Sequence, residues 1–479
     1  MHLIQPDLHT RRAFLKRSGQ LAMTGAALPL ALNLAALGEA AAFTGTGYKA
    51  LVCVFLFGGN DYANTVVTYD DPSYNLYNTI RGGGAGQTAG GIALAKADLT
   101  ATLLAPTAAP TDVLGQARQY ALHPAMTGLA GLFNSGQAAV QLNVGPLVVP
   151  LTRAQYNSPN RVLYPLPPQL FSHNDQQSIW QSSSPEGSKI GWGGNIGDLA
   201  LAGNAKSVFT CMSVSGNAVY LSGDTALQYQ VSTNGAIKIR PATDNTVFGS
   251  AAVKNAISAL IQQPRSQKLE NEYTRVTQRA IAAEVDVTQA LAPTAPGATP
   301  LATVFPTDGL GPQLKMVARL IKGRSTLGAT RQVFFVSLGG FDLHDNLITQ
   351  QPTLMDRVSA AMAAFYNATV EMGVDSNVTA FTASDFGRTL ASNGDGSDHG
   401  WGSHHFVMGG AVRGKNFYGS APAMAVSGPD DVGQGRLLPS TSVDQFGATL
   451  ASWLGISDSN LPIVVPHIGS FSKRNLGFV

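Results

Sequence analysis

Short apolar runs recur along the chain and predict a set of buried strands. The first, residues 49–57, reads KALVCVFLF, and similar runs cover residues 138–144, 332–338, 378–382 and 406–408. A continuous apolar run of this kind, bounded by glycines or turn residues, is typical of a strand buried on both faces of a parallel sheet.

Patterns with helical spacing separate these runs. They cover residues 123–134, 172–181, 267–283, 310–322, 353–372 and 443–454. The last follows Ser442, which stands three residues before Gln445 in the spacing of a capping box. Strands that alternate with helices predict an α/β fold, in which a doubly wound and mostly parallel sheet is flanked by helices. We expect residues 43–479 to form a single domain.

Other segments depart from this alternation. Residues 206–250 alternate apolar and polar positions between Gly and Asn turns, which predicts a small antiparallel β insertion. Residues 288–308 are rich in Ala and Pro and predict a loop, and residues 146–168 predict a proline-rich surface loop. The Gly-rich stretch 82–91 lacks the Gly-Lys-Ser/Thr ending of a phosphate loop, so we also interpret it as a loop.

The N-terminus has the pattern of a twin-arginine signal peptide. Arg11 and Arg12 precede an apolar stretch, and small residues follow at positions 38–42. A membrane anchor is the alternative, but the apolar stretch is short and interrupted by glycine for a span that needs about 20 apolar residues. We expect cleavage after residue 42, export by the twin-arginine translocase, a periplasmic or extracellular location, and no stable membrane span afterwards.

Charge does not favour a nucleic-acid partner. The whole chain carries 31 basic and 29 acidic residues. The first 42 residues hold four of the basic and two of the acidic ones, so 27 of each remain in the mature part. No basic patch of the nucleic-acid-binding type remains.

The two cysteines, Cys53 and Cys211, both lie in strand-like apolar segments. A disulfide is open to an exported protein. We favour two buried free thiols, because small buried cysteines are common in protein cores.

Acidic residues follow three of the predicted strands: Asp61, Asp342 and Asp385. Ligands of open α/β sheets bind beyond the carboxyl ends of the strands, where these carboxylates would meet. Their mutual repulsion calls for a cation, and the histidine-rich segment 399–405 could add nitrogen ligands. Carboxylates with imidazoles suit one or two divalent ions, zinc or manganese above all. Two ions about 4 Å apart would stabilise displacement at phosphorus or sulfur.

Each of these residues also has a structural interpretation. An Asp after a strand is often a turn residue or a helix cap. His344 and His173 could each be a hydrogen-bonded structural histidine. His404 and His405 point to opposite faces if they lie on a strand, so at most one of them would reach a common site.

Several motifs together resemble the family known as domain of unknown function 1501. They are GGND (residues 58–61), SH (172–173), GGFDLH (339–344), SDFGRT (384–389) and DHG (398–400), and the likeness extends over essentially the whole mature chain. That family is similar to the alkaline phosphatase and sulfatase superfamily. The resemblance therefore implies an alkaline-phosphatase-like sheet and a metal-dependent hydrolase of phosphate or sulfate esters.

The resemblance also implies metal ligands in this chain. They are Asp61, Asp342, His344, Asp385 and His399. The superfamily often has three residues between the members of the Asp/His pair, whereas Asp342 and His344 have one. It also has a histidine after the aspartate of the second metal, where this chain has Phe386. A second metal site would therefore lack a ligand.

Catalytic assignments are Ser172, His173 and Arg388. Ser172 stands at the head of a predicted helix, where the helix N-terminus and a metal would favour its alkoxide. Thr65 and Thr152 are the alternative nucleophiles, and a helix cap is the structural alternative for Ser172. Arg388 could hold an anionic substrate oxygen or form a structural salt bridge. Neither cysteine lies in the Cys-x-Pro-x-Arg context of a formylglycine sulfatase.

Three functions follow as hypotheses. The first is an exported metal-dependent hydrolase of a small anionic ester or polymer. The second is a non-catalytic exported scaffold or binding protein that retains the hydrolase fold. A redox protein ranks last, because the chain has no Cys-rich cluster, haem motif or nucleotide fingerprint.

Overall fold

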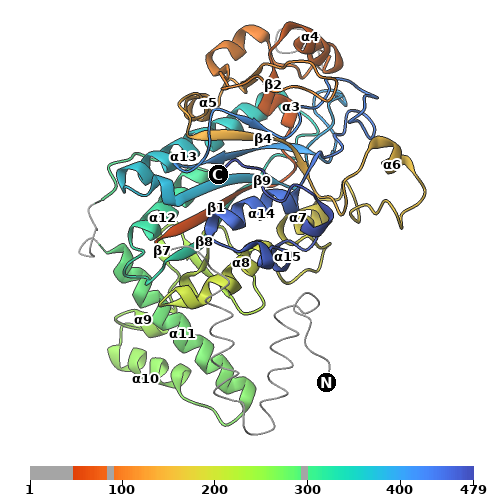
Figure 1. Ribbon diagram of the computed structural model, residues 1–479. Coiled ribbons are helices and arrows are strands. Elements are labelled where there is room, and N and C mark those ends of the chain that lie inside the picture. Colours follow the sequence, from red (N-terminus) through yellow and green to blue (C-terminus); the bar gives the residue numbers. More distant parts are fainter. Residues whose placement is uncertain (1–46, 83–90, 293–299) are drawn as a thin grey trace, which may run out of the picture.

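A computed structural model describes residues 47–82, 91–292 and 300–479 (Figure 1). The expected signal peptide lies outside these residues, as do most of the Gly-rich loop at 82–91 and residues 293–299 of the Pro/Ala-rich loop. Within the described residues, no helix is both long and apolar enough to cross a bilayer.

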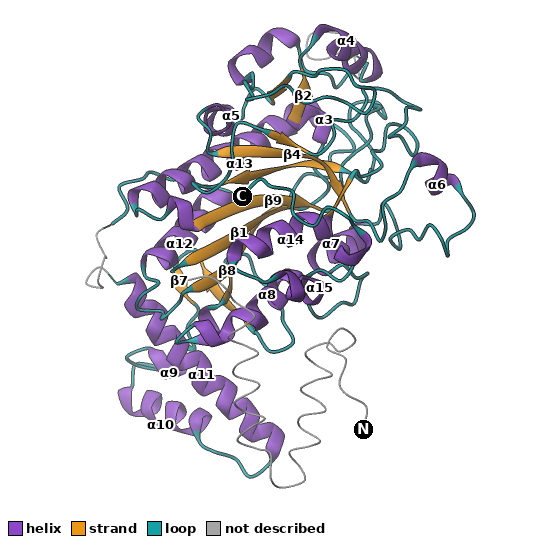
Figure 2. Ribbon diagram, in the orientation of Figure 1, coloured by secondary structure: helices purple, strands orange, loops and turns teal. Residues whose placement is uncertain are grey.

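A ten-stranded sheet runs through the centre of the molecule (Figure 2). Its order is β11-β4-β10-β9-β1-β8-β5-β6-β7, with β12 also paired to β4. The central strands β1 (Lys49–Leu56), β8 (Arg331–Leu338) and β9 (Val378–Ser384) are parallel. β4 (Ala138–Gly145) and β9 both pair antiparallel with β10 (Ser403–Met408). The predicted strands, and the mostly parallel α/β sheet, are thereby confirmed.

The segment expected as a small antiparallel insertion mostly extends this sheet. β5 (Cys211–Ser213) pairs parallel with β8, and β6 (Gln228–Ser232) pairs parallel with β5. Antiparallel pairing in this segment is limited to β6 and β7 (Gly235–Ala236). A separate two-stranded antiparallel sheet joins β2 (Val66–Thr68) to β3 (Tyr120–Leu122).

Helices cover both faces of the sheet, as the alternation predicts. On one face, Val52 and Val54 of β1 share a core with α5 (Thr127–Asn134), α11 (Lys268–Leu291), α12 (Leu310–Lys322) and α13 (Leu347–Glu371). On the other face, Leu51, Cys53 and Phe55 pack with α7 (His173–Ser182), α8 (Trp192–Ala200), α14 (Val443–Leu454) and α15 (Leu461–Val464). Successive residues of a strand point to opposite faces, so an all-apolar strand contributes side chains to the cores on both sides of the sheet.

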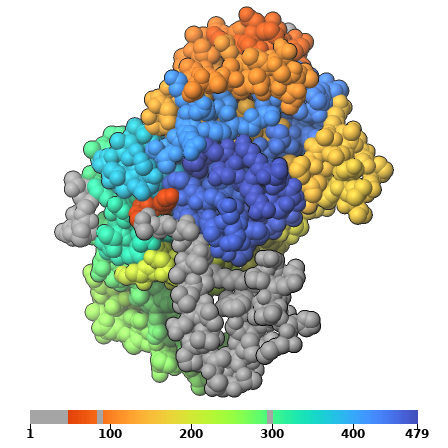
Figure 3. Space-filling model, in the orientation of Figure 1, coloured from red at the N-terminus to blue at the C-terminus, as the bar shows by residue number. Residues whose placement is uncertain are grey.

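Two helices are longer than the sequence pattern predicts. α13 begins at Leu347 and contains Pro352, whereas the pattern placed the start after that proline. α11 continues to Leu291, so the first residues of the loop predicted at 288–308 are helical. Helix α10 (Ala251–Gln262) lies beside α11 at one end of the molecule, and the segment around α6 (Arg153–Asn157) projects from its side (Figures 1 and 3).

Both cysteines are buried and unpaired. Cys53 lies on β1 and Cys211 on β5, with β8 between them. Burial raises the pKa of both thiols. The interpretation as two free thiols is confirmed.

Candidate metal centre

The carboxyl ends of the central strands bring distant parts of the chain to one place. Leu56 at the end of β1 is in register with Leu338 of β8 and with Ser384 of β9. Asp342 follows β8 after a Gly-Gly turn, and Asp385 follows β9 directly. The start of α7 and the loop before β10 reach the same place, and each contributes a histidine.

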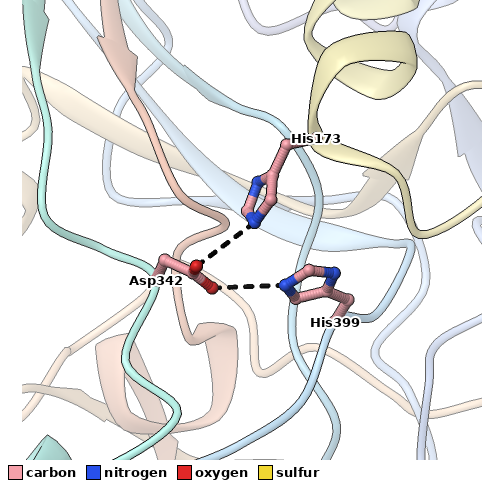
Figure 4. A group of neighbouring side chains, drawn as sticks. All are labelled: His173, Asp342 and His399. Carbon is pink, nitrogen blue, oxygen red and sulfur yellow. Dashed lines mark hydrogen bonds and ion pairs between the residues drawn. The ribbon is translucent and has the colours of Figure 1, made fainter.

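His173, Asp342 and His399 together form a group able to hold a metal ion. One donor atom from each can be chosen so that all three lie within 4.8 Å of one another. His173 Nε2 is 3.3 Å from Asp342 Oδ2, and His399 Nε2 is 3.2 Å from Asp342 Oδ1. Figure 4 shows both rings directed at the carboxylate.

His344 adds a third imidazole to this group. Its Nε2 lies 3.1 Å from Asp342 Oδ1 and 3.0 Å from His399 Nε2. We call His173, Asp342, His344 and His399 the His–Asp cluster. The three atoms Asp342 Oδ1, His344 Nε2 and His399 Nε2 form a triangle with sides of 3.0, 3.1 and 3.2 Å. Each of these atoms lies about 1.8 Å from the centre of the triangle. Because this is slightly shorter than the ~2.0–2.1 Å bonds of zinc, an ion just out of the plane of the triangle can contact all three donors.

Each imidazole of the cluster is held by its other nitrogen. His173 Nδ1 lies 2.7 Å from a carboxylate oxygen of Asp385, and His344 Nδ1 lies 3.2 Å from Asp398 Oδ1. His399 Nδ1 lies 2.8 Å from the carbonyl oxygen of Phe171. A carbonyl oxygen can only accept, so His399 Nδ1 carries the proton and its Nε2 presents a lone pair when the ring is neutral. Metal-binding histidines are characteristically oriented in this way.

Phe171 adopts an uncommon backbone conformation to supply that carbonyl. Its φ of 71° lies in the left-handed region, which a bulky residue rarely occupies. Such strain persists only where the surrounding structure enforces it, and it gathers at functional sites. No sequence motif marks Phe171, and Asp398 is marked only by its place in the DHG motif.

Arg388 holds the carboxylate of Asp342. Its Nη1 donates to Asp342 Oδ1 at 2.9 Å and to the Gly58 carbonyl at 2.8 Å, while Nε and Nη2 donate to the Ser397 carbonyl. Burial would raise the pKa of Asp342, but Arg388, with the neighbouring histidines, holds that pKa below its ordinary value. The Arg388 side chain is 0% exposed. It is thus buried against the cluster, which agrees with the alternative of a structural salt bridge.

Asp385 lies behind His173 and outside the metal-binding group. Its side chain is 0% exposed, and its Oδ2 accepts hydrogen bonds from Gly58 N at 3.1 Å and Gln177 Nε2 at 2.7 Å. Its hydrogen bond to His173 raises the pKa of that histidine, although burial opposes the shift. Asp385 is thus in contact with His173, which belongs to the group that could hold a metal ion, and is not itself in that group.

Asp61 lies in a buried ion pair and is not part of the His–Asp cluster. Its Oδ2 is 2.6 Å from Arg81 Nη2 and accepts from Ser397 Oγ at 2.7 Å. Its Oδ1 accepts from Asn64 N and caps α3 (Tyr62–Thr65). Both oxygens are therefore engaged in structural contacts, in keeping with the cap interpretation and not with the expected ligand role.

The nucleophile candidates all make structural hydrogen bonds. Ser172 precedes α7 without capping it, and its Oγ donates to Asp175 Oδ2 at 3.0 Å. Thr65 is buried and donates to the Asp61 carbonyl. Thr152 caps α6 in a capping box with Gln155. Ser172 remains the candidate nearest in sequence to the cluster, since it adjoins His173.

Phe386 packs between two of the cluster's imidazoles. Its ring centroid lies 4.9 Å from that of His173 and 4.7 Å from that of His399. Phe386 thus forms an apolar wall beside these two rings. His404 and His405 are both buried away from the cluster, and burial lowers their pKa to about 3.

The cluster as a whole fits a divalent metal. It offers three imidazole Nε2 atoms and a carboxylate, a donor set suited to zinc or a related ion. Burial lowers the pKa of His399, which keeps its lone pair available near neutral pH. The side chains of Asp342 and His344 remain 45% and 43% exposed, so the cluster is open to solvent.

Comparisons with solved structures return distant likenesses. Ps i-CgsB in complex with k-i-k-neocarrahexaose is 9% identical with a TM-score of 0.36, covering 90% of this chain and 77% of that one. Ps i-CgsB in a second structure is 11% identical with a TM-score of 0.34, over 90% and 77%. BT33494S-sulf, from work on glycosaminoglycan metabolism by Bacteroides thetaiotaomicron, is 10% identical with a TM-score of 0.32, over 86% and 74%. At these values we draw no conclusion about activity.

A comparison with curated protein sequences returns no match. A family model does match, over residues 48–465, and its description is "Protein of unknown function (DUF1501)". The match includes all four members of the His–Asp cluster and the residues that hold them. Because it spans most of the chain, this protein belongs to the DUF1501 family.

Proposed function

We propose that this protein is an exported, metal-dependent hydrolase of phosphate or sulfate esters. The observation that carries the proposal is the convergence of three imidazole Nε2 atoms on Asp342, each ring held at Nδ1 by a carboxylate or a carbonyl. His173, Asp342, His344 and His399 would hold the ion, zinc or manganese. A bound divalent ion would polarise an ester oxygen and lower the pKa of a water molecule.

Charge supports an anionic substrate. Three carboxylates and two guanidiniums contact the cluster or belong to it, which gives these five side chains a formal charge of −1: Asp342, Asp385, Asp398, Arg388 and Arg436. A divalent ion changes this to +1 and makes the site attractive to an anion. Substrate affinity should therefore depend on the metal as well as on the side chains.

The chain's own residues have distinct parts in this proposal. Arg388 keeps Asp342 ionised and fixed in position. Asp385 and the Phe171 carbonyl set the proton positions on His173 and His399. Phe386 walls one side of both rings and limits the approach of water to them. Ser172 is the proposed side-chain nucleophile, provided that it leaves Asp175; otherwise a water molecule attacks.

Export by the twin-arginine translocase belongs to the same proposal. It rests on the Arg11-Arg12 motif and on the apolar stretch that follows it. A protein that acquires its metal in the cytoplasm before export would fit that route. Fusion of residues 1–42 to a reporter, compared with Arg11→Lys/Arg12→Lys, tests it: export that is unchanged in the double variant contradicts the assignment.

The second candidate is a binding protein that retains the fold and the metal without catalysis. Phe386 in a ligand position and the engaged hydroxyl of Ser172 favour it. The two candidates differ in turnover, so the test must measure turnover on protein that has already been loaded with metal.

The test is hydrolysis of a panel of phosphate monoesters, phosphate diesters and sulfate esters by mature protein loaded with zinc or manganese. His399→Ala should lower kcat/KM for the preferred ester by about 100-fold or more, because it removes a metal ligand. His467→Ala is the matched control, since the hydrogen bond of that residue to Asp444 comes from its backbone. A metal-loaded wild type that hydrolyses none of the panel would overturn the hydrolase and favour the binding protein.

A further inference from the structure

We infer that Arg436 binds the anionic group of the substrate. The inference rests on the proposed function, and it names the residue that would recognise a phosphate or sulfate ester. The sequence suggested Arg388 for this part, but every nitrogen of that guanidinium already donates to Asp342 or to a backbone carbonyl. A different cation must therefore meet the anion.

Arg436 contacts the His–Asp cluster through His399. Its Nε donates to the carbonyl oxygen of His399 at 2.6 Å. Its guanidinium carbon stands 5.2 Å from the ring centroid of Phe171, the residue whose carbonyl accepts from His399 Nδ1. Arg436, Phe171 and His399 thus hold one another, so the position of the cation is tied to that of a proposed metal ligand.

The guanidinium of Arg436 keeps donor capacity for a ligand. Nη1 donates to the Gly433 carbonyl at 3.2 Å, and Nη2 makes no hydrogen bond with any of the described residues. The residue is half-buried, unlike Arg388. Within residues 47–82, 91–292 and 300–479, Arg436 is the cation that both contacts a cluster member and retains a nitrogen for a substrate.

The loop that carries Arg436 is well anchored. Asp431 Oδ1 accepts from Gly433 N at 2.6 Å and from Gly435 N at 2.8 Å. Leu390 N donates to the Gly435 carbonyl at 3.2 Å, which joins the loop to the segment after β9. A cation on such a loop is held in place before the ligand arrives, so binding need not immobilise it.

The chain contacts place Arg436 beside His399, a member of the cluster. Arg436 Nε donates to the carbonyl oxygen of His399, and Asp398 directly precedes His399. Asp398 in turn holds His344. The charge of Arg436 therefore lies next to the segment that carries His399 and the carboxylate that holds His344.

A guanidinium beside the cluster favours a tetrahedral oxyanion as the ligand. A guanidinium presents planar, permanently charged donors that suit phosphate and sulfate oxygens. Phosphate and sulfate share this geometry and differ in charge near neutral pH. Comparing their affinities identifies which ester the site prefers.

The experiment titrates inorganic phosphate and sulfate into zinc-loaded wild type, Arg436→Gln and Arg436→Lys, with calorimetric detection. Loss of a charge-assisted hydrogen bond should weaken binding of the preferred oxyanion by about 10- to 100-fold in Arg436→Gln, with Arg436→Lys in between. For the preferred ester, KM should rise more than kcat falls. Arg153→Gln is the matched control, because Arg153 Nη1 donates to the Ser427 and Gly428 carbonyls of a neighbouring stretch without contacting the cluster.

Each outcome is decisive. Wild-type affinity in Arg436→Gln with full metal content overturns the inference and leaves the hydrolase untouched. Loss of metal in Arg436→Gln also overturns it, because the residue would then act only by supporting His399. A zinc-loaded wild type that binds neither oxyanion overturns it as well. Failure of the hydrolase proposal is recognised separately, as absent turnover in protein that still binds the oxyanion through Arg436.

Discussion

The buried pair of Asp61 and Arg81 allows a sharp test of which aspartates serve structure and which serve metal. The Arg81 side chain is 0% exposed and that of Asp61 is 2% exposed, with 2.6 Å between Nη2 and Oδ2. Asp61→Asn keeps an oxygen to cap α3 but removes the charge that Arg81 faces. Arg81 then retains only the Thr389 and Leu390 carbonyls, at 3.4 and 3.2 Å.

The expected loss of unfolding free energy follows from the burial of this ion pair. Removing one partner of a buried ion pair leaves an uncompensated charge and costs about 3–5 kcal/mol. Asp61→Ala should cost about 1 kcal/mol more, because the cap of α3 is lost as well. The double variant Asp61→Asn/Arg81→Met should recover much of the loss, since neither charge is then left unpaired.

The assay is chemical denaturation followed by tryptophan fluorescence, combined with metal analysis of the folded fraction. We expect a large loss of unfolding free energy in Asp61→Asn and unchanged metal content per folded chain. An unchanged unfolding free energy together with loss of metal would instead identify Asp61 as a metal ligand.

Three further outcomes are expected. Asp385→Asn should weaken metal affinity by about 10- to 100-fold in a competition titration, because it frees His173 to rotate; unchanged affinity would contradict that role. Gly58→Ala should lower the unfolding free energy much more than Gly47→Ala. Both glycines have positive φ, but a Cβ at Gly58 would stand 2.4 Å from Asp342 N, whereas one at Gly47 meets nothing within 4 Å. Equal unfolding free energies of the two variants would exclude this close approach as a cause. Three buried histidines should make the protein acid-sensitive, because burial lowers their pKa to about 4 or 3: His123, His404 and His405. Their stabilising contribution is full above about pH 6.5 and declines as the pH falls toward those values, by up to about 1.4 kcal/mol per pH unit for each; an unfolding free energy that is the same at pH 7 and pH 5 would contradict it.

The central strands could be predicted because their burial leaves a direct mark on the sequence. β1, β8 and β9 are buried on both faces along most of their length, so their sequences are largely apolar. β5 was harder to interpret. It has three residues, and its parallel pairing with β8 depends on a crossover that no local pattern records.

The candidate site was only partly predictable. The motifs include Asp342, His344 and His399, whose side chains the fold brings into contact. Asp61 also follows a strand, but Gly58 and Gly59 turn the chain with φ values of 115° and 82°, and Asp61 then caps a short helix. Its partner Arg81 comes 20 residues later and carries no motif.

His173 illustrates the opposite difficulty. The sequence placed it beside a possible nucleophile, and only the fold brings the start of α7 to the end of β8. Arg388 and Asp385 share the SDFGRT motif, and a sequence motif does not distinguish a candidate ligand from a group that orients one. Burial makes that distinction, and burial depends on the tertiary packing.

Metal binding by His173, Asp342, His344 and His399 is open to a simple measurement. Elemental analysis of mature protein purified without chelator would compare wild type, His344→Ala/His399→Ala and Asp61→Asn. We expect about one zinc, manganese or related ion per chain in the wild type and in folded Asp61→Asn, and none in the double-histidine variant. A wild type that takes up no ion even when supplied with zinc or manganese, or a double-histidine variant that keeps its ion, would contradict the claim.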